Sequence, residues 1–281
     1  MSEPRRRPGL PRLIAAAVFV LLIVGGLYLQ SRPPASPPVP TAPDLKPTDA
    51  SAIEPPAAVA PLGRADLLEI VAVASSAFAG GEPPAEQQQD LIGRRFELRL
   101  PFGCHGPVSS DSQLAERWEY DPGTAVLKAR VTPQIWTDAA WLRAIAPDAQ
   151  FEAAEGFWLR RPWLRSEACP AFRSPLDAPP FLGEPRQTLA LVELSGADDS
   201  RVFRRDGRAY EVTRKLAPDG LGSTRGLRLA LEGQLSSFPD GRPVGCWSES
   251  PDLRPICAVA VRFEQVRIET ADRNVLGAWH R

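Results

Sequence analysis

The spacing of apolar and polar residues divides the chain into three regions of different character. Residues 13–29 form a run of 17 positions without a charge. As a helix this run measures about 25 Å, near the lower limit for crossing the hydrocarbon core of a bilayer. A proline-rich stretch follows, and beyond residue 61 the apolar residues recur mainly at alternate positions. The pattern predicts one membrane-spanning helix, an extended linker and a mainly β region.

Alternation of apolar and polar side chains predicts a series of strands separated by turns. Asp121-Pro-Gly123 has Pro and Gly where the central residues of a type II turn stand, so it predicts a hairpin between two of these strands. A separate strand has Leu227, Leu229, Leu231 and Leu235 on one face. The other expected strands cover residues 96–100, 117–120, 125–131, 156–161, 188–194 and 208–216.

The last long strand contains an irregularity. Val259, Val261 and Phe263 share one face, whereas the next apolar positions are Val266 and Ile268. Two residues stand between these sets where strict alternation allows one. A β-bulge at this point would return both halves to the core and bend the strand.

Two helices accompany the strands. Residues 66–79 are mostly helix formers with an apolar stripe, and Gly80-Gly81 provides a stop. A shorter helix is expected from about Asp138 to Ile145, before Pro147. We therefore expect a mainly β fold, an antiparallel sandwich or barrel with one or two short helices, preceded by a transmembrane helix and a linker. The expected regions are 1–12 (cytoplasmic), 13–30 (signal-anchor), 31–61 (disordered Pro-rich linker) and 62–281 (periplasmic mainly-β domain).

Basic residues set the expected orientation of the apolar run. Arg5, Arg6, Arg7 and Arg12 precede it, whereas only Arg32 follows closely. The positive-inside rule then keeps the N-terminus in the cytoplasm and exports the rest. A cleaved signal peptide is the alternative, but no small-x-small cleavage site directly follows the run. We expect a single-pass protein of the bacterial inner membrane, held there by residues 13–30.

Proline dominates the next stretch: ten of the 31 positions from Ser31 to Pro61. Such a segment is extended and semi-rigid, with a reach of up to about 90 Å when stretched. It is interpreted either as a spacer across the envelope or as a plain linker of biased composition. The layout of residues 1–61 resembles that of TonB-type energy transducers and several cell-wall scaffold proteins. The resemblance covers layout alone, because residues 62–281 carry no matching motif.

Charge and composition restrict the classes of partner that the chain is expected to bind. Residues 1–30 carry a net charge of +3 and the remainder −4, giving −1 for the whole chain. The mildly acidic exported part has no electrostatic footprint for nucleic acid, so none is expected as a partner. Only Lys46, Lys128 and Lys215 are lysines among 33 basic residues, a composition typical of GC-rich bacterial genomes.

Four cysteines, at 104, 169, 246 and 257, lie on the side expected to be exported. An even number in an oxidising compartment predicts two disulfides, with three connectivities open. Cys246 and Cys257 enclose a short turn-rich loop, which favours their pairing and leaves Cys104 with Cys169. Metal binding or thiol chemistry is the alternative, but the chain has two histidines and no Cys-x-x-Cys. We expect no metal and no cofactor.

Seven tryptophans are present, and two of them stand among arginines in residues 157–165. Aromatic and arginine side chains are enriched at binding hot spots, so this segment is the candidate surface for a periplasmic protein or a cell-wall component. Alternatively, the tryptophans fill the core and the arginines face water. The candidate binding residues are Trp158, Arg160, Arg161, Trp163 and Arg165.

Catalytic signatures are weak. The chain lacks the Gly-x-Ser-x-Gly, His-Glu-x-x-His, Walker and dinucleotide motifs. His105 follows a cysteine in a turn-rich segment, and His280 is next to last, where a terminus tends to fray. Candidate partners for a triad are Ser109, Ser110 and Asp111, and candidate paired carboxylates include Glu152 and Glu155.

Binding or scaffolding of an envelope component is therefore the leading hypothesis, and an enzyme is the less favoured one. The alternative is a membrane-anchored hydrolase that acts on cell-envelope polymers. A sensory ectodomain is disfavoured because about 12 residues precede the apolar run, too few for a cytoplasmic signalling domain.

Overall fold

A computed structural model describes residues 59–82, 86–170, 186–200, 204–216 and 226–281. The chain divides into two compact units, Met1–Ala57 and Ala58–Arg281, and the described residues belong to the second. The expected signal-anchor, residues 13–30, lies outside them, as does most of the linker. Within the described ranges, no helix has both the length and the apolar character needed to cross a membrane.

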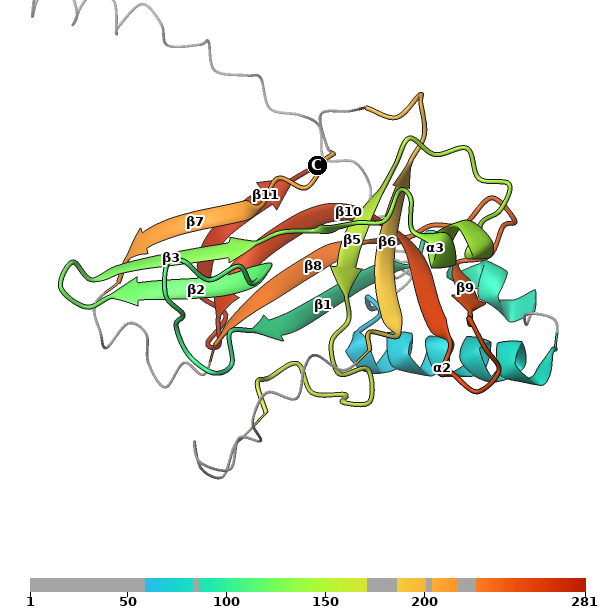
Figure 1. Ribbon diagram of the computed structural model, residues 1–281, viewed down its shortest axis with the longest axis horizontal. Helices are drawn as coiled ribbons and strands as arrows, with labels where there is room; N and C mark the ends of the chain where they lie inside the picture. Colours follow the sequence, from blue (N-terminus) through green and yellow to red (C-terminus); the bar gives the residue numbers. More distant parts are fainter. Residues whose placement is uncertain (1–58, 83–85, 171–185, 201–203, 217–225) are drawn as a thin grey trace, which may run out of the picture. The chain divides into compact units, whose positions relative to one another are not determined.

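The described unit is mainly β with two α-helices, which confirms the predicted class (Figure 1). The helices are α2 (Arg64–Gly80) and α3 (Ala140–Ile145), with the 3-10 helix η1 (Glu86–Leu91). The strands are β1 (Arg95–Phe102), β2 (Glu116–Asp121), β3 (Val126–Val131), β4 (Gln134–Ile135), β5 (Ala153–Trp158), β6 (Leu189–Ser195), β7 (Tyr210–Lys215), β8 (Leu227–Leu235), β9 (Val244–Trp247), β10 (Ile256–Thr270) and β11 (Val275–His280).

Strand β10 organises the larger sheet. Its first half pairs with β6 in parallel and with β9 in antiparallel orientation. Its second half pairs with β8 and β11, both antiparallel. The path through the larger sheet runs β1-β8-β10-β6-β5-β4, and β2-β3-β7 form a separate antiparallel sheet. The larger sheet is therefore mixed, not purely antiparallel as expected, because β6 and β10 run in the same direction.

The predicted β-bulge is confirmed at the middle of β10. The register against β8 shifts between Phe263 and Gln265, so that Glu264 is the extra residue. The side chains of Phe263 and Val266 are both buried as a result. One inserted residue thus keeps the apolar positions of both halves of the strand in the core.

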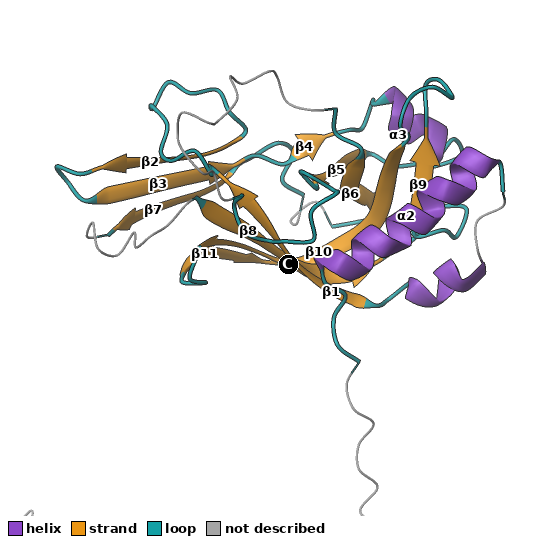
Figure 2. Cartoon of the chain, turned by 90° about the horizontal axis from the view of Figure 1, so that it is seen from below, coloured by secondary structure: helices purple, strands orange, loops and turns teal. Residues whose placement is uncertain are grey.

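Apolar side chains gather in two clusters. The first contains Phe96, Leu98 and Ile268, with Leu67 and Val71 from α2 packed among them. The helix itself lies against β1, β9 and β10 (Figure 2). The second cluster joins Trp136, Phe238 and the α3 residues Leu142 and Ile145. Burial of these apolar surfaces is the main stabilising contribution to the fold.

Local sequence signals account for several element ends. The Asp66 carboxylate accepts a hydrogen bond from the Gly63 backbone N–H (2.7 Å) at the start of α2. The helix ends at Gly80, and the next residue, Gly81, has a left-handed φ of 68°, as the Gly-Gly pair predicted. The β2–β3 turn differs from prediction, because the left-handed residue is Ala125 (φ 53°), not Gly123. The type II assignment was therefore wrong, although the hairpin itself is present.

Both disulfides are present, between Cys104 and Cys169 and between Cys246 and Cys257. They have the pairing that the spacing favoured, and no cysteine is free. Cys246 and Cys257 are direct partners across β9 and β10. The chain-entropy model assigns about 3 kcal/mol to the shorter loop and about 4 kcal/mol to the longer one.

Candidate functional site

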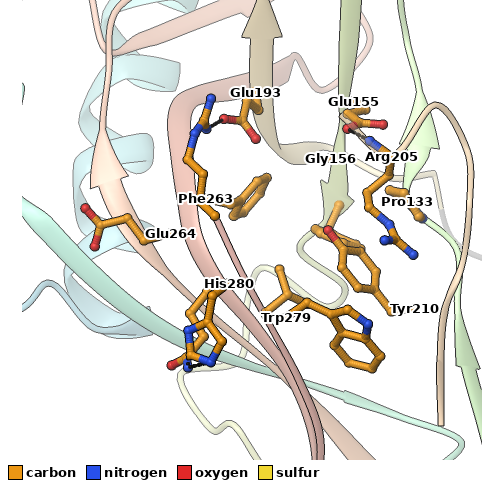
Figure 3. Close-up of a pocket in the computed structure, with 14 residues that line it drawn as sticks. Pro133, Glu155, Gly156, Glu193, Arg205, Tyr210, Phe263, Glu264, Trp279 and His280 are labelled. Atoms are coloured by element: carbon orange, nitrogen blue, oxygen red, sulfur yellow. Dashed lines mark hydrogen bonds and ion pairs between the residues drawn. The ribbon is translucent and has the colours of Figure 1, made fainter. Parts of the chain in front are cut away.

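A cavity of about 170 Å³ lies between β5, β6 and β7 on one side and the second half of β10 with β11 on the other. Figure 3 shows Glu155 and Glu193 on one side of it, with Tyr210 and Trp279 on the other. Eight of the aromatic and charged side chains that line it come from five strands, the segment before β7 and the end of the chain. They are Phe157, Tyr210, Phe263 and Trp279 (aromatic) and Glu155, Glu193, Arg205 and Arg281 (charged).

The aromatic side chains form a continuous wall. Phe157 packs edge-on against Phe263, with ring centroids 5.6 Å apart, and also lies 6.2 Å from Tyr210. Tyr210 in turn meets Trp279 edge-on at 5.1 Å. The Arg205 guanidinium lies 4.4 Å from the centre of the Tyr210 ring, within range of a cation–π contact.

The two cavity glutamates are brought together by the register of β5 and β6. Glu155 and Glu193 are direct partners in this antiparallel pair, so their side chains leave adjacent points of one sheet. Glu155 is only 8% exposed, and its carboxylate accepts a 2.7 Å hydrogen bond from the backbone N–H of Arg205. Glu193 forms an ion pair with Arg281.

Burial raises the pKa of Glu193 above its ordinary value, and the negative charge of Glu155 adds to this effect. The Arg281 guanidinium acts in the opposite direction and does not cancel it. The pKa of Tyr210 is also raised, chiefly because its phenol is buried. Tyr210 therefore stays protonated at neutral pH and offers the cavity a hydrogen-bonding hydroxyl, not a phenolate.

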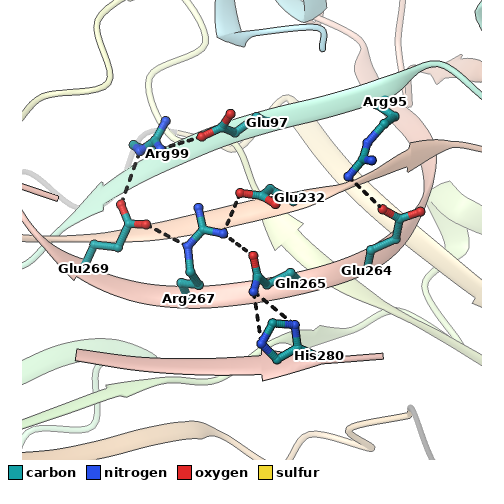
Figure 4. Close-up of polar contacts among 9 residues, drawn as sticks. All are labelled: Arg95, Glu97, Arg99, Glu232, Glu264, Gln265, Arg267, Glu269 and His280. Carbon is teal, nitrogen blue, oxygen red and sulfur yellow. Dashed lines mark hydrogen bonds and ion pairs between the residues drawn. The ribbon is translucent and has the colours of Figure 1, made fainter. Parts of the chain in front are cut away.

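A second charged region lies on the face of β1, β8 and β10 opposite the first apolar cluster. We call Glu97, Arg99, Glu232, Arg267 and Glu269 the ion-pair ladder. Glu269 bridges the two arginines, 3.2 Å from Arg99 and 2.8 Å from Arg267 (Figure 4). Glu97 also pairs with Arg99, and Glu232 with Arg267. Each carboxylate of the ladder thus contacts at least one guanidinium.

The sequence-predicted binding residues fall into two environments. Trp158 is partly buried and packs against Trp136 and Trp141, with ring centroids 5.0 and 5.5 Å away. Trp163 is 57% exposed, and Arg165 is exposed as well. The structure thus places Trp158 in an aromatic cluster and Trp163 at the surface of the following loop.

That loop is held to the start of α2. The buried guanidinium of Arg64 donates to the carbonyl oxygens of Arg160, Arg161 and Leu164, at 2.7 to 2.9 Å. The side chain of Arg160 pairs with Glu116 at 3.2 Å, and that of Arg161 lies 3.8 Å from the Cys104 sulfur. Among the predicted site residues, Trp163 and Arg165 are the exposed ones.

Two of the residues considered for a triad, Ser109 and Asp111, are in contact. Ser109 donates to the exposed Asp111 and lowers its pKa, and His105 is exposed in the same segment. The expectation that His280 frays was wrong: it belongs to β11, and its ring contacts the Gln265 amide at 3.0 Å. No group of His, Cys, Asp or Glu that could hold a metal ion occurs in the described ranges.

The two carboxylates that were named as candidates from the sequence lie in different places. Glu152 is exposed and pairs with Arg204 at 3.0 Å, whereas Glu155 faces Glu193 in the cavity. Sequence reasoning missed Glu193. A usable signal was present, because Glu155 in β5 and Glu193 in β6 are each the single charged residue of an otherwise uncharged strand.

Comparison with known proteins gives only a short local likeness. Over 77 residues the chain is 35% identical to the 1,4-alpha-glucan branching enzyme GlgB 1 of Xanthomonas campestris pv. campestris (strain 8004), which is 25% of this chain and 10% of the enzyme. Over 73 residues it is 36% identical to GlgB 1 of Xanthomonas axonopodis pv. citri (strain 306), again 10% of that enzyme. The chain thus spans about a tenth of the length of the curated relatives it matches. No protein family matches the chain, and neither does any solved structure.

Proposed function

We propose that the chain is a single-pass protein of the bacterial inner membrane whose disulfide-bonded β domain binds an envelope component in the periplasm. Two disulfides suit an oxidising compartment, which supports export of the domain. Residues 13–30, which contain the apolar run, supply the proposed anchor, and the proline-rich stretch supplies the reach. The local likeness to branching enzymes covers too little of them to supply a substrate.

The cavity carries the binding part of this proposal. It combines aromatic walls with a few buried polar groups, the composition typical of ligand sites. The exposed Trp163 and Arg165 on the loop held by Arg64 are proposed as a second contact surface for a larger partner.

Site-specific photocrosslinking in the envelope tests the binding role. A photoreactive residue at His280, which lines the cavity and is exposed, should capture an envelope component. The same residue at Leu253, which is 39% exposed in the loop before β10, serves as the control. Equal capture from both positions, or none from His280, would count against the cavity as the binding site.

A reporter enzyme that is active only after export tests the location. Fused after Arg281 in the full chain, it should be active, because the proposal places the described domain in the periplasm. A reporter that works only in the cytosol would remove the membrane and periplasm assignments together.

The second candidate function, an anchored hydrolase of envelope polymers, is favoured by the facing pair of Glu155 and Glu193. Glycoside hydrolysis uses two carboxyl groups, one of which keeps its proton through a raised pKa. The raised pKa of Glu193 fits the acid, although its ion pair with Arg281 opposes protonation.

Assay of the full chain on isolated envelope polymers tests that candidate. Glu155→Gln and Glu193→Gln should each lower product release by roughly a hundredfold or more. Glu211→Gln is the matched control, because Glu211 follows Tyr210 on β7 but is exposed on the other face. Release that survives in both cavity variants would exclude the pair as the catalytic groups.

A further inference from the structure

Glu155 and Glu193 line the cavity side by side, and Glu155 is the more deeply buried of the two. Glu193 pairs with Arg281, but among the described residues no cationic side chain lies within ion-pair distance of Glu155. The hydrogen bond that Glu155 accepts comes from a backbone N–H, that of Arg205. A buried carboxylate beside a second carboxylate is costly without a counter-charge. Within the part of the chain that the structure describes, no positive charge is thus paired with Glu155.

The nearest arginine does not supply that charge. The guanidinium of Arg205 donates from Nε to the Arg208 carbonyl at 3.1 Å and from Nη2 to the Ala209 carbonyl at 2.5 Å. These bonds hold it in its own turn, over the face of Tyr210. The cavity therefore already shows that its aromatic wall accepts a flat cation.

Size and lining agree with a further cationic guest. About 170 Å³ exceeds several times the roughly 30 Å³ that one water occupies in the liquid, so an alkylammonium or guanidinium head with part of its chain would fit. Tyr210, Phe263 and Trp279 provide the apolar contacts, and aromatic faces attract cations directly.

Resting on the binding function proposed above, we propose that the cavity recognises an organic cation, an alkylammonium or guanidinium group that pairs with Glu155 between the aromatic walls. An anionic group would meet two carboxylates, and a neutral polyol would leave the charge of Glu155 uncompensated. The cationic group either belongs to a small free molecule or is the basic side chain of a polypeptide.

Calorimetric titration of the full chain in detergent, with ligands of matched length and different charge, tests this inference. n-Butylammonium should bind at least roughly tenfold more tightly than n-butanol, because it adds a charge-assisted hydrogen bond to Glu155. Butyrate should bind more weakly still. Equal affinity for the ammonium and the alcohol, or no binding of the ammonium, would overturn the cationic assignment.

Two cavity variants and one control test whether the cavity glutamates cause the preference for the ammonium ligand. Glu155→Gln should weaken butylammonium binding at least roughly tenfold and leave butanol unchanged. Glu193→Gln is the second variant, and it should weaken ammonium binding too, because it removes the negative charge next to Glu155. Glu211→Gln should change neither affinity. Thermal unfolding identifies any variant that is not folded, and full ammonium affinity in either folded cavity variant would contradict the proposal.

Ligands with one and with several cationic groups distinguish the two sources of the cation. If a free molecule is the ligand, N-acetyl-lysine amide and blocked tetralysine should differ by no more than the roughly fourfold statistical factor. A larger gain for tetralysine indicates a polypeptide. Capture from position 280 without ammonium binding would support the proposed binding function and contradict the cationic ligand. Ammonium binding without capture would support the cationic ligand and contradict the binding of an envelope component.

Discussion

The ion-pair ladder and the cavity use the same residue types in opposite ways. In the ladder, Glu269 contacts two guanidinium groups, and its side chain is 3% exposed. In the cavity, Glu155 is almost as deeply buried, but its one hydrogen-bond partner among the described residues is a backbone N–H. A buried carboxylate that contacts a guanidinium group has its charge compensated within the protein. A buried carboxylate without such a contact can instead pair with a cationic ligand. Contact with a cation, not burial, separates Glu269 from Glu155.

The largest effect is expected from breaking the ladder. Glu269→Ala leaves Arg99 and Arg267, 12% and 14% exposed, without their shared partner, and should lower the free energy of unfolding by about 3 kcal/mol. Urea denaturation measures it. Glu211→Ala removes an exposed pair with Arg130 and should cost less than about 1 kcal/mol. Similar losses in both variants would show that the ladder is not a stabilising unit.

Aromatic residues extend the comparison to apolar groups. Trp158→Ala removes a partly buried ring from its contacts with Trp136 and Trp141 and should cost about 2 kcal/mol, below the range for a fully buried aromatic. The same denaturation curves report it. An unchanged denaturation midpoint would mean that Trp158 contributes little to packing and would favour the prediction that it belongs to a binding surface.

The cavity carboxylate Glu193 should make the stability of the protein depend on pH. Its pKa is raised in the folded state, so it binds protons more readily there than in the unfolded chain. Its contribution to stability is fully present below the unfolded pKa of about 4.3 and is lost as pH rises through the higher folded pKa. Unfolding free energies measured across this window should fall less with pH for Glu193→Gln than for the unmodified chain. Parallel curves would contradict the assigned shift.

The smallest effect on stability is expected at the exposed loop. Trp163→Ala should change the free energy of unfolding by no more than about 0.5 kcal/mol, because the side chain is 57% exposed. Crosslinked capture of a large partner should nevertheless weaken if Trp163 contacts it. A stability loss comparable to that of Trp158→Ala would show that the residue is part of the core.

Local patterns in the sequence predicted much of the fold. The helix expected at residues 66–79 is α2, and the strand expected at 188–194 is β6 within one residue. The strand expected at 156–161 instead begins at Ala153, because Ala-Ala-Glu-Gly is uncharged but for Glu155 and gives little alternation. The bulge at Glu264 could be located because two apolar sets of opposite phase flank it.

The cavity could not be predicted in the same way. The pairing of Glu155 with Glu193 depends on the register between β5 and β6, which are separated by 30 residues. Nothing in either strand fixes that register by itself. The opposite wall depends on β11, which brings Trp279 to Tyr210 of β7. Sequence reasoning instead selected the dense Trp/Arg segment, because neighbouring aromatic and basic residues are visible without knowledge of strand pairing.

The single inserted residue in β10 limits how this chain can change. Phe263 before it faces the cavity, and Glu269 after it joins the ladder. Loss of one residue at position 264 would turn every later side chain to the other face, with Ile268 toward water and Glu269 toward the apolar cluster. Substitutions along this strand alter one contact each, whereas a change of its length would undo both charged regions at once. The number of residues here is therefore under tighter constraint than the identity of most of them.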